Sequence, residues 1–329
     1  MSGKAMKQRG FDPGNAGSAS AAFVRTIVIL AVLLLIAIVL SKGVFVLPSN
    51  LANIVRQNAM LLFITLAQFL VLLTGGIDLS AGATVAFSSV IMVLFQGYSI
   101  GGALVLVLLL GCTTGLVNGF IISYLNLPAF VITLGMQQIV YSAAKVMTNG
   151  AKIEHSLNGA ELLPALAGFY KAEIFRIIIP IWLCVLVVIL IALYMRTKYG
   201  YSLYAVGGNV KTAFFSGMPV KLVSIAAYCL SGALCAFAGF LFVSRVGTGD
   251  PDTGTLLALD SIAACSIGGV SLAGGKGTVS GAVMGLVALC VLNNVMSLVH
   301  VSPNVQPLVK GIVILLAVFM NSTQNKTGK

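Results

Sequence analysis

Two carboxylates lie where the neighbouring sequence offers little to solvate them. Asp78, in "GGIDLSAG", and Asp260, in "LALDSIAACS", lie in or beside long apolar runs. An ionisable group in such surroundings is costly, so each is a functional candidate by default. The alternative is structural: each carboxylate caps a helix that begins just after it, and Asp78 fits a cap at the inner edge. For Asp260 capping and gating both stay open. Neither has a basic partner at helical spacing, which argues against a proton relay or an ion-coupling pair.

No other residue pattern indicates catalysis or a metal site. The stretch "GGVSLAGGKGT" resembles a phosphate loop, but Gly277 follows Lys276 where Ser or Thr is needed, and Val270 occupies the position of the earlier glycine. His155 and His300 have no metal-ligand spacing. The six cysteines form no CxxC pair and are read as small apolar side chains: Cys112, Cys184, Cys229, Cys235, Cys265 and Cys290. We therefore expect no enzyme activity, bound metal or bound cofactor in this chain.

The composition is that of a membrane protein. The 329 residues are 59% apolar and 8% charged, against roughly 25% charge in a soluble domain, and the mean hydropathy is +1.06. Apolar runs of about 20 residues indicate transmembrane helices. The first run exceeds a signal-peptide core and lacks a cleavage site, so it is expected to be retained. The fold class predicted is all-α and polytopic, with ten spans: 23–41, 57–74, 83–97, 101–125, 128–148, 174–195, 220–244, 256–273, 278–299 and 305–321.

The basic residues predict the orientation. They form no tract that would bind nucleic acid but lie at the ends of apolar runs, as orientation signals do. With the N-terminus inside, 11 of them are cytoplasmic or at the inner edge, whereas five of the eight acids lie outside: Glu154, Glu161, Glu173, Asp250 and Asp252. Both termini are therefore expected in the cytoplasm, as tails 1–22 and 322–329 around a membrane domain 23–321. A weak repeat matches spans 4 and 5 to spans 9 and 10, which is typical of an inverted 5+5 transporter.

A polar, basic segment, "YSLYAVGGNVKTAFFSGMPVK" at 201–221, interrupts the apolar sequence. Asn209 is a good N-cap, and Gly217 suits the left-handed position just after a helix. The helix between them, 210–216, has about two turns and is too short to be stable alone. It must dock on something, and Gly207 with Gly208 permit a tight turn or a close contact. A connector that rests on the membrane surface is the alternative.

Several motifs taken in order carry a family resemblance. "GGIDLSAG", "LPAFVITLGM", "YAVGGNVKTAFFSGMPV", "LSGALCAFAGF" and "LDSIAACSIGGVSLAGGKGTVSG" occur along residues 23–321. Together they resemble the ribose-type sugar permease family of bacterial ABC importers. The resemblance implies a homodimer in the inner membrane, in contact with lipid, that pairs with a cytoplasmic ATPase and a periplasmic sugar-binding protein. ATP and Mg²⁺ would then be bound by the partner ATPase.

In that family the counterpart of the 196–221 loop is the coupling helix, which sits in a cleft of the ATPase. Family members usually carry small residues after the Asn, where this chain has Thr212, Ala213, Phe214 and Phe215. The two aromatics are expected to be docking anchors; membrane-surface contacts are the alternative. The coupling residues implied are Gly207, Gly208, Asn209, Lys211, Phe214, Phe215, Ser216 and Gly217.

A sugar also needs polar and aromatic lining along its path. Most such residues in membrane spans instead hold helices together, and an importer fed by a binding protein needs only a weak site. The candidates are Gln68, Asp78, Asn118, Phe130, Gln137, Gln138, Asp260, Asn293 and Asn294.

The function predicted is import of a monosaccharide, ribose or a related sugar, driven by the partner ATPase. An ion-coupled secondary sugar transporter is the main alternative, and it requires functional charges inside the membrane. A channel or receptor would require a ring of charges or a large soluble sensor, and the sequence has neither.

Overall fold

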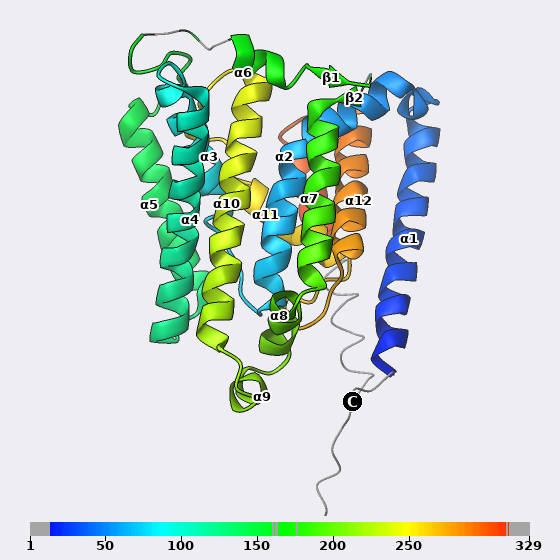
Figure 1. The fold of residues 1–329 in the computed structure, drawn as a ribbon. Coiled ribbons are helices and arrows are strands. Elements are labelled where there is room, and N and C mark those ends of the chain that lie inside the picture. The colour runs from blue at the N-terminus through cyan, green and yellow to red at the C-terminus, as the bar shows by residue number, and fades with distance from the viewer. Residues whose placement is uncertain (1–13, 160, 162–163, 176, 314, 316–329) are drawn as a thin grey trace, which may run out of the picture.

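The computed structural model describes residues 14–159, 161, 164–175, 177–313 and 315. It is a bundle of long helices with short elements at both ends (Figure 1). The elements are α1 (Gly14–Leu40), a 3-10 turn η1 (Val44–Val46), α2 (Pro48–Leu73), α3 (Ala81–Gln96), α4 (Ile100–Leu125), α5 (Ala129–Thr148), α6 (Pro164–Phe169), β1 (Glu173–Ile174), β2 (Ile177–Ile178), α7 (Ile179–Met195), α8 (Lys198–Gly208), α9 (Val210–Phe215), α10 (Val220–Val246), α11 (Leu257–Ile267) and α12 (Val279–Leu298).

The helical fold class is confirmed, with β1 and β2 as a two-residue antiparallel pair. Among the described residues, α2, α4, α10 and α12 are each long and apolar enough to cross a membrane, and α7 and α8 meet the same criterion only when taken together, as a pair bent by 72°. The apolar helices α3, α11 and residues 26–40 are shorter. Of the tenth predicted span, residues 306–313 are helical and most of the remainder lies outside the described residues.

Four predicted boundaries were wrong. α7 begins at Ile179 rather than at 174, because β1 and β2 precede it. α1 begins at Gly14 rather than at 23, so the predicted tail is helical from there on. α2 begins at Pro48 rather than at 57, because a proline is favoured in the first helical turn. α11 ends at Ile267 rather than at 273, because the next stretch turns repeatedly through glycines with positive φ, including Gly269 and Gly274.

The centre of the bundle is α10, which packs on α2, α3 and α4. Its contact with α4 is close because glycines face each other. A Cβ atom added to Gly115 would lie 2.0 Å from the carbonyl oxygen of Tyr228, and one added to Gly232 would lie 1.9 Å from that of Gly111. Small residues at such crossings let two backbones approach, as membrane helices require.

The helix contacts of the two halves match. α2 packs on α11 and α12, and α10 packs on α3 and α4. α3 also packs on α4, as α11 packs on α12. In the first half, the long helix α2 therefore packs on the short α11 and the long α12 of the second half. In the second half, the long helix α10 packs on the short α3 and the long α4 of the first half.

The two ends of the bundle differ in charge. α8 and α9 lie at one end, where α1 also begins, and α6 with β1 and β2 lies at the other (Figure 1). We call the first the basic end, because α8, α9 and the residues beside them carry only basic charges: Arg196, Lys198, Lys211, Lys221 and Lys276. The opposite end carries acids, and two of them form ion pairs there, Lys145–Asp252 at 2.7 Å and Lys152–Asp250 at 3.1 Å.

Candidate functional site: a projecting helix at the basic end

The helix α8 turns the chain away from α7 and anchors it to the bundle. The Thr197 hydroxyl caps α8 by accepting from Gly200 N at 3.4 Å. Leu203 is buried, and the Tyr204 hydroxyl donates to the carbonyl of Gly277 at 2.8 Å. α8 was not predicted from the sequence, although Thr197 was a usable N-cap signal.

The end of α8 touches the end of α2 through a glycine. A Cβ atom added to Gly207 would lie 1.8 Å from the carbonyl oxygen of Leu73 and 2.6 Å from the amide nitrogen of Gly275. Gly275 N also donates to Leu73 O at 3.0 Å. Gly207 thus makes a close contact, and so does Gly208, because a Cβ atom added to Gly275 would lie 2.7 Å from the Cα and from the amide nitrogen of Gly208.

The predicted caps of α9 are present. Asn209 Oδ1 accepts from Thr212 N at 3.0 Å. Gly217 has a φ of +78°, and its amide donates to Phe214 O at 3.0 Å. The helix ends at Phe215, with Ser216 as the C-cap residue, one position earlier than predicted.

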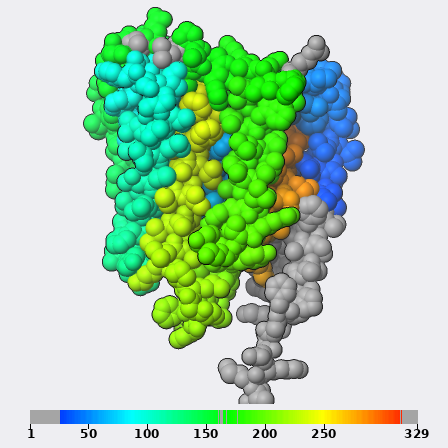
Figure 2. Space-filling model, viewed as in Figure 1, coloured from blue at the N-terminus to red at the C-terminus, as the bar shows by residue number. Residues whose placement is uncertain are grey.

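Almost all of α9 is open to its surroundings. Ala213 is buried, but Phe214 is 65% and Phe215 84% exposed, with their rings edge to face at 5.8 Å. Lys211 and Ser216 are exposed as well. The segment projects beyond the body of the bundle (Figure 2). Two exposed aromatics beside a lysine, with no acid on α9, form a surface suited to a partner.

Asp78 lies in a polar cluster inside the bundle. Its carboxylate accepts from the amide and the hydroxyl of Ser80, at 3.0 and 2.6 Å, and from the Ser231 hydroxyl at 3.1 Å. Asn118 donates to the Ser80 hydroxyl at 2.9 Å. The Gln68 amide, oriented to satisfy both of its atoms, pairs with the backbone of Asp78 at 3.1 and 3.2 Å. All of these side chains are buried, and they join α2, α3, α4 and α10.

The cluster corrects the expected depth of Asp78. Ser231 lies 11 residues beyond the first residue of α10, about 16 Å along the helix axis. Asp78 therefore fixes the turn that starts α3 well inside the bundle, and not at its inner edge. The structural role expected for it agrees with its contacts.

Asp260 does have a basic partner. In the first turn of α11, its Oδ2 lies 2.9 Å from the Nζ of Lys310, and both side chains are largely buried. Helical spacing could not reveal this partner, because Lys310 is 50 residues further along the chain.

The remaining polar candidates differ in surroundings. Asn294 exchanges two hydrogen bonds with Asn50, at 2.9 and 3.0 Å, and so joins α12 to α2. Asn293 is half-buried. Phe130 and Gln138 are exposed on α5, and Gln137 is half-buried beside them.

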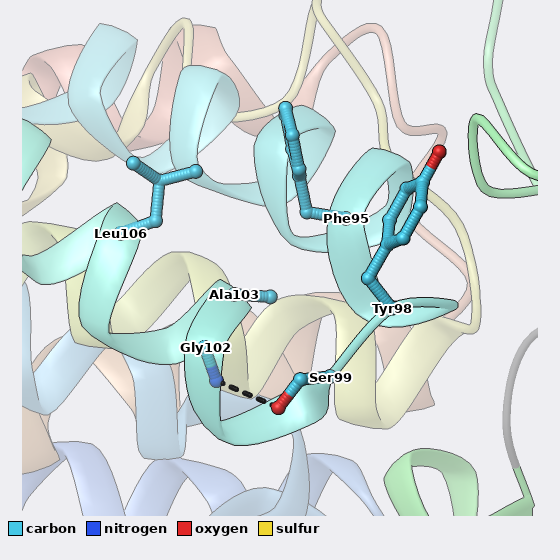
Figure 3. A pocket seen from close by; sticks show the side chains of 6 residues that line it. All are labelled: Phe95, Tyr98, Ser99, Gly102, Ala103 and Leu106. Carbon is cyan, nitrogen blue, oxygen red and sulfur yellow. Dashed lines mark hydrogen bonds between the residues drawn. The ribbon is translucent and has the colours of Figure 1, made fainter.

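A small pocket between α3 and α4 is unsuited to a sugar. It has a volume of about 210 Å³ and lies at the turn between α3 and α4 (Figure 3). Its lining is largely apolar, and the Ser99 hydroxyl already accepts from Gly102 N at 3.1 Å. Monosaccharides need several polar contacts, which this pocket does not offer.

Comparison with known proteins settles the family. Residues 50–318 match the model described as the branched-chain amino acid transport system, permease component. The chain belongs to this family. The permease is thus a multi-pass protein of the bacterial inner membrane, and the expected family resemblance is confirmed.

The permease is similar over most of its length to curated sugar permeases. It is 36% identical over 300 residues to the ribose import permease protein of Escherichia coli, covering 89% of this chain and 92% of that one. It is 34% identical over 313 residues to the galactose/methyl galactoside import permease protein of Escherichia coli, covering 90% and 92%. It is 30% identical over 345 residues to the xylose transport system permease protein of Escherichia coli, covering 87% and 88%. No solved structure matches it.

Proposed function

We propose that the permease is the membrane subunit of an ABC importer that moves a monosaccharide into the bacterial cell. Three relatives that cover most of the chain are named for ribose, galactose and xylose. The observation that carries the proposal is α9, a capped helix with two exposed aromatics that a partner would cover. The substrate is a sugar of this class, with ribose as the first to test.

The basic end faces the cytoplasm in this proposal, since basic residues are retained on that side of a membrane. Both chain termini then lie inside, around ten spans arranged as an inverted repeat. The matching contacts of α2 and α10 with the opposite halves support such a repeat.

The segment α8–α9 is the lever that receives movement from the ATPase. Phe214, Phe215 and Lys211 contact the ATPase, while Asn209 and Gly217 define the helix ends. Gly207 and Gly208 carry the movement to α2 and to the 271–278 loop, with which α8 is in close contact. Closure of the ATPase around ATP pushes Ser216 and its neighbours and switches the bundle between inward-open and outward-open states.

The partners follow from the same mechanism. A homodimer of the permease, two ATP sites on cytoplasmic chains and a periplasmic sugar-binding protein complete the importer. ATP and Mg²⁺ belong to the ATPase, and the permease performs no catalysis. Phe130, Gln137 and Gln138 are the predicted pathway residues with access from outside the bundle, whereas Gln68, Asp78, Asn118 and Asn294 hold helices together.

An ion-coupled secondary transporter would use the two intramembrane carboxylates. Asp260 is neutralised by Lys310, and Asp78 accepts three hydrogen bonds, which favours structural roles for both. Uptake of labelled ribose, galactose and xylose into proteoliposomes decides between the two mechanisms. The ABC mechanism requires ATP, the ATPase and the loaded binding protein; uptake driven by a Na⁺ or proton gradient without ATP would reject it.

A further inference from the structure

The outward face of α5 carries a line of polar side chains between exposed apolar ones such as Ile139 and Val146. Val131, Gly135, Gln138, Ser142 and Lys145 are all exposed. They follow one another at intervals of four and three residues, which places them within an arc of about 80° on the helix. The other side of α5 is buried against α3 through residues that include Val140 and Ala144. The polar stripe is therefore the centre of the outward face.

The outward faces of α1 and α7 show no such stripe. Between residues 26 and 40, every exposed residue of α1 is apolar, and so is every exposed residue of α7. Such faces suit lipid, which offers no hydrogen-bond partners. An amide, a hydroxyl and an ammonium group in one line do not.

A second observation points to the same face. Between α10 and α11, residues 247–256 have no helix or strand. Cβ positions show that this segment runs beside α3, with Gly249 against Val90 and Gly254 against Gly82. The eight residues from Val90 to Gly82 span about 12 Å of helix, so irregular backbone descends that far beside α3.

Parts of this segment are exposed beside α5. Asp252 is 61% exposed and bonded to Lys145 at 2.7 Å, and Thr255 is exposed too. Irregular backbone at membrane depth is tolerated only inside protein or along a water-filled cavity. An exposed, charged segment of this kind excludes lipid contact.

We propose that Gly135, Gln138, Ser142 and Lys145 of α5, with Asp252 and Thr255, form the wall of a water-filled passage for the sugar. Gln138 and Ser142 exchange hydrogen bonds with the sugar hydroxyls as it passes. The Lys145–Asp252 pair lies at the outer mouth. This inference rests on the proposed function for the identity of the solute. Access of water to the outward face of α5 does not depend on the proposed function.

Cysteine labelling of the assembled transporter in membrane vesicles tests the passage. In a background with the six native cysteines replaced by alanine, Gln138→Cys and Ser142→Cys are compared with Ile189→Cys on α7. Gln138 and Ile189 each lie ten residues from the outer end of their helices, and Ile189 is 49% exposed on an apolar face. The probe is a charged methanethiosulfonate reagent, which reacts with thiolates in water.

Both α5 variants should react about ten-fold or more faster than Ile189→Cys, because a thiol ionises in water and not in lipid. Labelling should block uptake, and excess sugar should slow the labelling. If Gln138→Cys reacts as slowly as Ile189→Cys, no water-filled passage runs along α5 and the proposal is wrong. So would a disulfide between two copies of Gln138→Cys without reaction with the charged reagent, since that marks a dry interface. ATP-dependent uptake by the parent protein tests the proposed function separately, so either idea can fail alone.

Discussion

The ammonium group of Lys310 lies 2.9 Å from a carboxylate oxygen of Asp260, and the two largely buried side chains join α11 to the helical stretch 306–313. Removing one charge leaves the other buried and unpaired, which costs about 3–5 kcal/mol. We predict that Lys310→Met or Asp260→Asn alone lowers the thermal stability of the permease in detergent.

The double variant Asp260→Asn with Lys310→Met is the control, because it leaves no unpaired charge. It should recover most of the loss. Single variants as stable as the parent protein would show that the pair contributes nothing to the fold.

Asp78 acts by accepting hydrogen bonds from Ser80 and Ser231. Asparagine keeps an acceptor oxygen, whereas leucine leaves these buried donors unsatisfied, at about 1–3 kcal/mol for each group. We predict substantial uptake for Asp78→Asn and little for Asp78→Leu. Loss of uptake in both variants, with normal stability of Asp78→Asn, would instead indicate a proton relay.

The contact between α4 and α10 leaves no room for a methyl group at Gly115, where a Cβ atom would lie 2.0 Å from Tyr228 O. Gly115→Ala should therefore destabilise the permease by about 1–3 kcal/mol. Gly101→Ala, on the same helix and with only a Ser99 atom at 4.0 Å, is the matched control. Equal melting temperatures for the two variants would contradict this packing.

The exposed Ser216 reports which side the basic end faces. We predict that a Ser216→Cys variant reacts with a membrane-impermeant thiol reagent in inside-out vesicles and not in intact cells, since basic ends stay in the cytoplasm. Labelling of intact cells would show that the basic end faces outside and that the whole bundle has the opposite orientation.

Local signals predicted much of this structure. The caps at Asn209 and Gly217 are set by a few neighbouring residues, so sequence alone was enough to find them. The apolar runs located the long helices for the same reason. The pairing of Asp260 with Lys310 depends on tertiary structure, and no spacing rule reaches across 50 residues.

Other features depend on which way a helix faces. Gln138 was a predicted pathway residue, but Ser142 and Lys145 became candidates only once their exposure on α5 was known.

The end of α11 was misplaced because small apolar residues continue past Ile267 while the backbone turns at the glycines that follow. Hydropathy does not record that change of backbone direction.

The central claim is that α9 couples ATP hydrolysis to sugar movement, and a surface variant tests it without disturbing the spans. Lys211→Glu with Phe214→Ala removes one charge and one exposed ring from α9. Gly217→Val forces a β-branched residue to a φ of +78°, at roughly 1–2 kcal/mol locally, and tilts the helix end. Phe175→Ala, which removes an 87% exposed ring beside β1 and β2, is the control for binding of the ATPase.

The deciding measurement is ATP-driven uptake of labelled sugar into proteoliposomes that contain the permease, its ATPase and the loaded binding protein. We predict that Lys211→Glu with Phe214→Ala keeps the stability of the permease but loses most uptake, together with the stimulation of ATP hydrolysis by the binding protein. Gly217→Val should lose both in the same way. If the double variant retains its ATPase on purification and transports sugar as fast as the parent protein, α9 is a passive connector and the account is wrong.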